Sequence, residues 1–360
     1  HSGNQTTTVA EGVVCDGFDA ATSCAGDGIT SPGGLSGGVL PGGVPGPFDN
    51  AAGVEAPEVG LIVKWNRATS QWEDEDGRNW SNGVRFHLPD YDVFTIDAVS
   101  LNQTAAHRHV GTTLLNMVVH PDTGHLFVSN TEALNHVRFE GEGIHGGTTV
   151  QGHLAESRIT VIPAPNVSSD ASSGARHLNK HVDFSVLAHD PGFDNTAAAK
   201  SLAMPMDMAI HHDPVLGSST LYVAAFSSSK VGIFDVAELE ADTFVPSESQ
   251  HIGLSAGGPG GLALSADGST LYVSTRFDNG FSVVDTASRS ETHHVLLHNP
   301  EPASVVEGRP FLYDALATSA NGTESCASCH LAGDMDQLAW DLGDPDGAVT
   351  TNPMHLKFSE

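Results

Sequence analysis

The residues best suited to chemistry lie near the end of the chain, in the stretch Ser325-Cys326-Ala327-Ser328-Cys329-His330. Two thiols at this spacing can form thioether bonds with the two vinyl groups of a haem, and the adjacent histidine can then bind the iron as its proximal ligand. The C-x-x-C-H motif therefore predicts covalent haem c on Cys326 and Cys329, with His330 on the iron.

A dithiol redox pair and half of a zinc site are the alternative interpretations of this motif. A thioredoxin-like pair is typical of a βαβ unit, whereas the residues flanking Cys326 are rich in Gly and Asp. A zinc site would need a second pair of ligands, and the only other cysteines, Cys15 and Cys24, lie about three hundred residues upstream. The spacing favours haem.

The sixth position on the iron has candidates further along the chain. Met335 follows His330 too closely to reach the opposite haem face, whereas Met354 and His355 come after a long Gly-, Asp- and Pro-rich stretch. Met354 is slightly favoured because a thioether is the commoner partner in small electron-transfer haems, while an open position would admit peroxide or oxygen. Packing beside Pro353 and exposure on a solvated tail are the alternative roles of the two residues.

Three further residues near the motif have predicted roles. Tyr313 and Trp340 are expected to pack against the porphyrin rather than to relay electrons. Arg309 is expected, by charge alone, to pair with a haem propionate.

Cysteine usage also predicts the compartment. Cys15 and Cys24 lie nine residues apart in a Gly-, Asp- and Ser-rich stretch, where a disulfide is their expected use. A disulfide and haem c both indicate a periplasmic, secreted or cell-surface protein.

The chain begins at His1 without an initiator Met or an apolar leader, as expected of a processed secreted chain. No apolar run is long enough to predict a membrane span.

The charge balance limits the choice of partner. The chain has 15 Lys and Arg against 44 Asp and Glu, a net charge of −29. Such a field repels a phosphate backbone and an anionic membrane, which excludes nucleic acid. It attracts a cationic redox partner protein, although adaptation to a salty environment explains the acidity equally well.

The elements that position the motif are indicated by internal repeats. An apolar strand, an Asp/Gly turn and a second strand recur at Met117–Asn130, Met208–Ala225 and Leu262–Thr275. The last two copies continue into a third strand at Val231–Asp235 and Phe281–Asp285, in step at an offset of 50 residues. Repeats of this length with several strands each are typical of β-propeller blades.

Two degenerate repeats are also predicted. The offset of 95 residues between the first two copies leaves room for one unit with strands at Arg158–Ile162 and His181–Val186. Another is indicated upstream at Gly60–Trp65 and Asp92–Asp97.

The predicted fold is all-β, a β-propeller of about five to seven blades. The propeller is expected over residues 55–305, after an irregular Gly- and Pro-rich segment at 1–54. A small, mainly helical or irregular haem-binding segment is expected at 306–360.

Two family resemblances support this division. The run Asp267-Gly268-Ser269-Thr270-Leu271-Tyr272-Val273-Ser274 resembles the YVTN-type β-propeller repeat, which implies the fold and says little about function. Residues 308–330, with 334–336 and 340–343, resemble the first haem motif of the bacterial di-haem cytochrome c peroxidase family. That family carries two such motifs and a longer C-terminal part, whereas this sequence has one motif and thirty residues after it.

Other metals are predicted from the histidines and the acidic turns. His107 and His109 would share one face of a strand, and with His120, His125, His136, His145 and His153 they could surround copper or zinc at the propeller mouth. Exposed surface histidines are the simpler explanation. The turns at 74–77 and 344–347 offer oxygen ligands for Ca²⁺, although neither has the register of an EF-hand.

Three functional hypotheses follow from these features. The first is electron transfer by an extracytoplasmic haem c protein on a propeller scaffold. The second, implied by the family resemblance, is a peroxidase-like oxidoreductase. The third is a surface propeller that binds a ligand or metal and carries an accessory haem.

Overall fold

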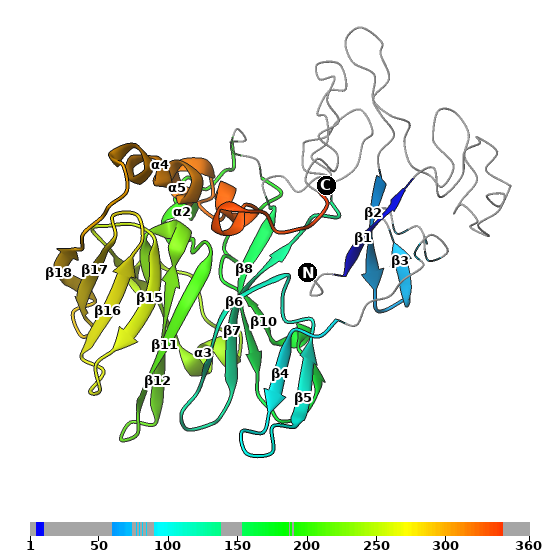
Figure 1. Ribbon diagram of the computed structural model, residues 1–360, viewed down its shortest axis with the longest axis horizontal. Coiled ribbons are helices and arrows are strands. Elements are labelled where there is room, and N and C mark those ends of the chain that lie inside the picture. Colours follow the sequence, from blue (N-terminus) through cyan, green and yellow to red (C-terminus); the bar gives the residue numbers. More distant parts are fainter. Residues whose placement is uncertain are drawn as a thin grey trace, which may run out of the picture. The chain divides into compact units, whose positions relative to one another are not determined.

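The computed structural model describes residues 5–10, 60–73, 77, 79, 81, 84, 90–137, 153–186, 188 and 191–340 (Figure 1). The chain divides into two compact units. Unit 1 takes its described residues from 1–90, 133–154 and 337–360, and unit 2 consists of Tyr91–Glu132 and Ala155–Asp336. This division does not decide the predicted boundaries at residues 54 and 305, which stay predictions.

Unit 1 contains a three-stranded antiparallel sheet in the order β1-β2-β3. Its strands are β1 (Thr6–Ala10), β2 (Gly60–Asn66) and β3 (Gln71–Glu73). Trp65 and Trp72 pair across β2 and β3 with their ring centroids 5.7 Å apart. Strand β1 lies within the segment predicted to be irregular, so that prediction was wrong for these five residues.

Unit 2 is built from four sheets, three of which have four antiparallel strands (Figure 1). The first sheet consists of β4 (Val93–Ile96), β5 (Gln103–Arg108) and β9 (Ser169–Asp170). The second consists of β6 (Thr113–Val119), β7 (Leu126–Ala133), β8 (Ala155–Ile162) and β10 (Ala175–His177). The third consists of β11 (Pro205–Asp213), β12 (Ser218–Ala225), β13 (Lys230–Asp235) and β14 (His251–Gly253). The fourth consists of β15 (Pro259–Leu264), β16 (Thr270–Thr275), β17 (Gly280–Asp285) and β18 (Ser290–Leu296).

The first strands of the three four-stranded sheets, β6, β11 and β15, are neighbours in space. The pairing of each strand with the second strand of its sheet shifts register at the same place, as at a β-bulge. The shift lies between Leu114 and Asn116 in β6, between Pro205 and Met208 in β11, and between Pro259 and Gly261 in β15. A shared bulge at one position of the repeat confirms that the three matching sequence segments are the same part of three blades.

Asp207 links these three inner strands. Its Oδ1 accepts a hydrogen bond from Nδ2 of Asn116 on β6, and its Oδ2 accepts one from the backbone N–H of Leu262 on β15 at 2.7 Å. A carboxylate that bonds to both neighbouring blades holds the inner strands in register.

The hydrophobic cores lie between successive sheets. Val93 on β4 packs with Val128 on β7, Phe127 on β7 packs with Val223 on β12, and Ile233 on β13 packs with Val273 on β16. Each sheet therefore buries its faces against its neighbours, as blades around a common axis do. The fold is a β-propeller. The described residues do not test the predicted count of five to seven blades.

The two predicted degenerate repeats were wrong. Residues Arg158–Ile162 lie in β8, inside the same blade as β6 and β7, and His181–Val186 forms turns rather than a strand. The extra length that suggested another blade lies in the connections between β7 and β8 and between β10 and β11. Upstream, β2 belongs to unit 1 and β4 to unit 2, so these strands do not form one blade.

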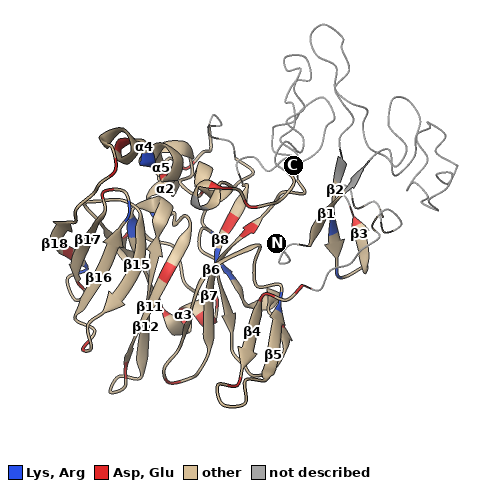
Figure 2. Ribbon diagram, in the orientation of Figure 1, with Lys and Arg blue, Asp and Glu red and all other residues tan. Residues whose placement is uncertain are grey.

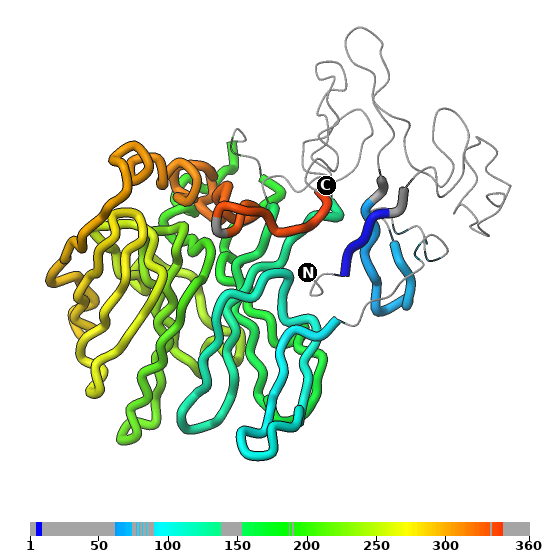
Figure 3. Tube along the Cα trace, viewed as in Figure 1, coloured from blue at the N-terminus to red at the C-terminus, as the bar shows by residue number. Residues whose placement is uncertain are grey.

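The C-terminal part of unit 2 is helical and irregular, as predicted. It contains α4 (Ala303–Tyr313), α5 (Ala315–Thr318), η4 (Cys326–Ser328) and η5 (Leu331–Gly333). Figure 3 shows this part of the trace, in orange, running back over the green strands of the middle blades. None of the helices in the described part of the chain has the length and apolar character needed to cross a bilayer.

Candidate functional site

The C-x-x-C-H motif forms a single helical turn. The backbone N–H of Cys329 and that of His330 both donate to the carbonyl oxygen of Cys326, at 3.3 and 2.9 Å. Residues three and four positions apart lie on the same side of such a turn. Cys326, Cys329 and His330 therefore face one way.

His330 is oriented by a backbone group. Its Nδ1 lies 3.2 Å from the carbonyl oxygen of Asp334. A carbonyl can only accept, so Nδ1 carries the proton and Nε2 carries the lone pair. A histidine that binds a metal through Nε2 is commonly held in this way by its other nitrogen.

Both cysteines of the motif are free thiols. Cys326 is exposed and Cys329 is partly buried. Burial raises the pKa of the Cys329 thiol, and the negative charges of Asp336, Glu324 and Cys326 raise it further. These surroundings favour the neutral form of the Cys329 thiol.

The side of the turn opposite the cysteines is anchored to the propeller. Ala327, between the two cysteines, is fully buried and packs with Met204, Phe226 and Phe277. The hydroxyl of Ser325 lies 3.1 Å from that of Ser227 in η2 (Phe226–Ser228). The motif is therefore attached to the loop that follows strand β12.

A buried carboxylate adds a second anchor. Glu324 is 5% exposed, and its Oε1 accepts a hydrogen bond from the backbone N–H of Ala155 at 3.0 Å. This bond joins the motif to the start of β8, in the blade before the one that Ser227 contacts.

The residues predicted to support a haem have other contacts. Tyr313 packs against Phe226, with ring centroids 5.5 Å apart. Arg309 is 8% exposed, forms an ion pair with Glu301 and donates to the carbonyl oxygen of Phe277 at 3.1 Å. These contacts do not test the predicted pairing of Arg309 with a propionate, which stays a prediction.

Two other predicted residues lie on either side of a unit boundary. Met335 belongs to unit 2 and is partly buried. Trp340 belongs to unit 1 and is 3% exposed. Neither placement tests its predicted relation to a haem.

Several predicted site residues lie outside the described residues. They are Cys15 and Cys24 of the predicted disulfide, Met354 and His355 as distal ligands, His1, His145, and all of the two acidic turns except Gly77. These assignments stay predictions.

The predicted metal ligands His107 and His109 do not share a face of one strand. Both ring nitrogens of His107 are hydrogen-bonded within the protein. Its Nε2 donates to the carbonyl oxygen of Pro165 and its Nδ1 accepts from the Ser169 hydroxyl, both at 2.9 Å. His109 lies beyond the end of β5 with a φ of 59°, and its Nδ1 is 2.9 Å from the Asp170 carboxylate. The predicted copper or zinc ion gains no support from these contacts.

Two neighbouring histidines from the same prediction also have separate protein partners. Nε2 of His120 lies 2.7 Å from the Ser219 hydroxyl, and Nδ1 of His125 lies 2.6 Å from Glu240. These contacts join the blade of β6 to that of β11, so they are inter-blade links.

Sequence reasoning missed the residues that hold the motif in place. Ser227, Glu324 and Met204 carry no local signal of their role, since their partners lie far away in the chain. The capping arrangement of Ser325 and Ser328 around η4 was the one local cue to an ordered turn.

Comparison with known proteins finds similarity of structure only. No family model and no curated protein sequence matches the chain. A hydrazine synthase chain from Kuenenia stuttgartiensis is 17% identical with a TM-score of 0.35, over 63% of this chain and 65% of that one. A periplasmic gluconolactonase from Pseudomonas aeruginosa is 14% identical with a TM-score of 0.36, over 71% of this chain and 54% of that one.

A protein of unknown function from Bacteroides caccae is also similar, with 10% identity and a TM-score of 0.31, over 67% of this chain and 70% of that one. This chain spans less than two thirds of the length of the hydrazine synthase and gluconolactonase chains. Similarity at this level carries no argument about activity.

Proposed function

We propose that this protein is a c-type haem protein that transfers electrons, with the propeller as its scaffold. The observation that carries the proposal is the single turn on which Cys326, Cys329 and His330 face one side, with His330 Nδ1 held by the carbonyl oxygen of Asp334. This arrangement fits two thioether attachments and one axial ligand.

Each residue of the turn has a separate role in this proposal. Cys326 is exposed and can be reached by a porphyrin vinyl group, and Cys329 supplies the second attachment. His330 presents Nε2 as the proximal ligand. Ala327 and Ser325 fix the backbone of the turn to the propeller. The bound haem would supply an iron that gains and loses one electron reversibly.

The acidity of the chain supports a cationic partner. Figure 2 shows Asp and Glu spread over the blades and their turns, with few Lys and Arg among them. With a net charge of −29, the protein would attract a basic electron carrier and accelerate its encounter at low salt. Haem c attachment also supports a location outside the cytoplasm.

Mass spectrometry of protein matured in a host that attaches haem c tests the proposal. We expect the mass of one haem on the peptide containing residues 326–330, together with haem absorption. The control is the C326A/C329A variant, which should lack both. Colourless protein in which an alkylating reagent modifies both thiols would refute haem attachment.

A spectrum recorded with cyanide or peroxide separates electron transfer from peroxidase chemistry. Electron transfer predicts a six-coordinate haem that reacts with neither reagent, since both axial positions are then filled. Ready binding of cyanide and rapid reaction with peroxide would instead support the peroxidase-like hypothesis.

A further inference from the structure

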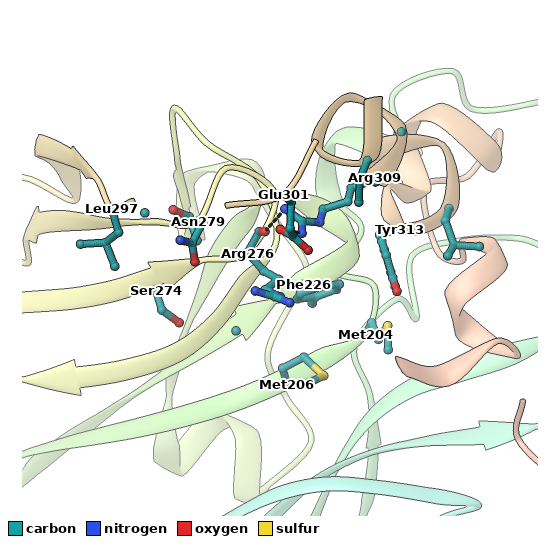
Figure 4. A pocket seen from close by; sticks show the side chains of 16 residues that line it. Met204, Met206, Phe226, Ser274, Arg276, Asn279, Leu297, Glu301, Arg309 and Tyr313 are labelled. Carbon is teal, nitrogen blue, oxygen red and sulfur yellow. Dashed lines mark hydrogen bonds and ion pairs between the residues drawn. The ribbon is translucent and has the colours of Figure 1, made fainter. Parts of the chain in front are cut away.

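A large pocket lies in unit 2 between helix α4 and the last blade (Figure 4). Its volume is about 820 Å³, which is within the range of small-molecule sites in proteins. Its walls come from the start of β11, from η2, from the start of β15, from the end of β16, from the start of β17 and from α4. Nothing in the proposed haem attachment uses this cavity.

The floor and one wall of the pocket are apolar and adaptable. Met204 and Met206 form the floor in Figure 4, and Phe226 and Tyr313 stand beside them. The rings of Phe226 and Tyr313 meet edge to face, with an interplanar angle of 89°. Methionine and aromatic side chains together suit a flat or flexible apolar body.

The charged residues of the pocket are basic on balance, in a chain that is strongly acidic. The lining includes Arg276, Arg309 and a single carboxylate, Glu301. Arg309 is buried and paired with Glu301, so these two charges compensate each other. Arg276 also acts electrostatically on Glu301, but two arginines face this one carboxylate, so the lining keeps a net positive charge.

Arg276 is the group suited to hold a ligand. Its side chain is exposed and extends into the pocket above Met206 and beside Phe226 (Figure 4). Within the part of the chain that the structure describes, its guanidinium donates no hydrogen bond, and neither does the hydroxyl of Tyr313. A guanidinium beside an apolar surface is suited to a carboxylate, which it can bind through two parallel hydrogen bonds.

We infer that this pocket binds a small amphipathic carboxylate, with its carboxylate on Arg276 and its apolar body against Met204, Met206, Phe226 and Tyr313. The wall formed by Phe226 and Tyr313 also packs against Ala327 of the motif, so the ligand would lie on the opposite side of this wall from the cysteines. The inference does not depend on the presence of haem.

Isothermal titration calorimetry of the full chain with 3-phenylpropionate, and with its neutral analogue 3-phenylpropionamide, tests the inference. We expect the carboxylate to bind at least about tenfold more tightly than the amide, since only the carboxylate forms the charge-assisted bonds. Arg276→Gln should remove this difference by weakening the carboxylate and leaving the amide unchanged.

The matched control is Arg289→Gln, which removes an exposed arginine at the other end of the same blade. This variant should bind both compounds like the unmodified protein. Absence of binding, equal affinity for the acid and the amide, or full affinity in Arg276→Gln would overturn the inference. Calorimetry measures binding directly, so a failure of the haem proposal would not be mistaken for a failure here.

Discussion

His251 shows how a single residue makes stability depend on pH. It lies on β14, partly buried, and burial lowers the pKa of its imidazole to about 4, with the charge of Lys230 adding to the effect. The unfolded chain, with an ordinary histidine pKa near 6.5, binds more protons than the folded protein between these values. The contribution of neutral His251 is therefore present above pH 6.5 and is lost as the pH falls toward 4.

We expect His251→Gln to reduce the loss of the free energy of unfolding as the pH falls from about 7 to about 4. Between about pH 7 and pH 4, urea unfolding should show that the unmodified protein loses on the order of 2 kcal/mol more than the variant. His293→Gln, an exposed histidine on β18, is the control and should follow the unmodified protein. Parallel curves for all three proteins would show that His251 does not titrate as inferred.

At the scale of elements, the turn between the first two strands of a blade can limit how closely the preceding blade approaches. Gly217 and Gly268 occupy such turns, with φ values of 65° and 70°. A Cβ at Gly217 would meet nothing within 4 Å, whereas one at Gly268 would lie 2.1 Å from Nδ1 of His211, in the preceding blade. The same backbone conformation is therefore used once in open space and once at an interface.

Alanine at these two glycines separates backbone strain from crowding. Gly217→Ala should lower the free energy of unfolding by about 1 kcal/mol, the cost of a left-handed residue with a Cβ. Gly268→Ala should cost at least ~2 kcal/mol more, because His211 must move. Chemical denaturation of both variants measures the difference, and equal losses would show that the blades do not meet as closely here as described.

The elements were predicted well where the repeat is local. Alternating apolar residues around an Asp/Gly turn predicted β11, β12 and β13, and the same pattern predicted β15, β16 and β17. The fourth strand of each blade was missed because it carries little of this pattern. Strand β8 was assigned to another blade because the connection before it is long.

The motif itself was predictable from spacing, since Cys326, Cys329 and His330 lie within five residues. Its surroundings were not, because Ser227 and Ala155 are close to it only after the chain has folded. The pocket beside Arg276 escaped notice for the same reason, as its walls come from six separate elements. Tertiary contacts between distant segments carry no local signature in one sequence.

At the scale of the whole molecule, the net charge of −29 opposes the compact state. Like charges repel one another more strongly when the chain is folded, and dissolved salt screens this repulsion over about 10 Å at 0.1 M. Stability is therefore expected to depend on ionic strength as well as on the packing between blades.

We expect the thermal unfolding midpoint at pH 7 to rise by several degrees as NaCl increases from about 0.02 to about 0.5 M. At a pH of about 4.8, the isoelectric point of the sequence, positive and negative charges balance, so the same salt increase should have a much smaller effect, which provides the control. Calorimetric scans at the two pH values measure both. A midpoint at pH 7 that does not change with salt would show that self-repulsion is negligible.

The carboxylate of Asp207 has a consequence for engineering by exchange of repeats. It accepts a hydrogen bond from the side-chain amide of Asn116 in the preceding blade and one from the backbone N–H of Leu262 in the following blade. The matching positions in those two blades are Asn116, whose amide has one acceptor oxygen, and Gly261, which has no side chain, so neither neighbour could supply the two acceptor oxygens if it were copied into the middle place. The blades of this protein therefore cannot be exchanged freely. A variant with its blades in a new order would need an aspartate at the position of Asp207 in whichever blade takes the middle place.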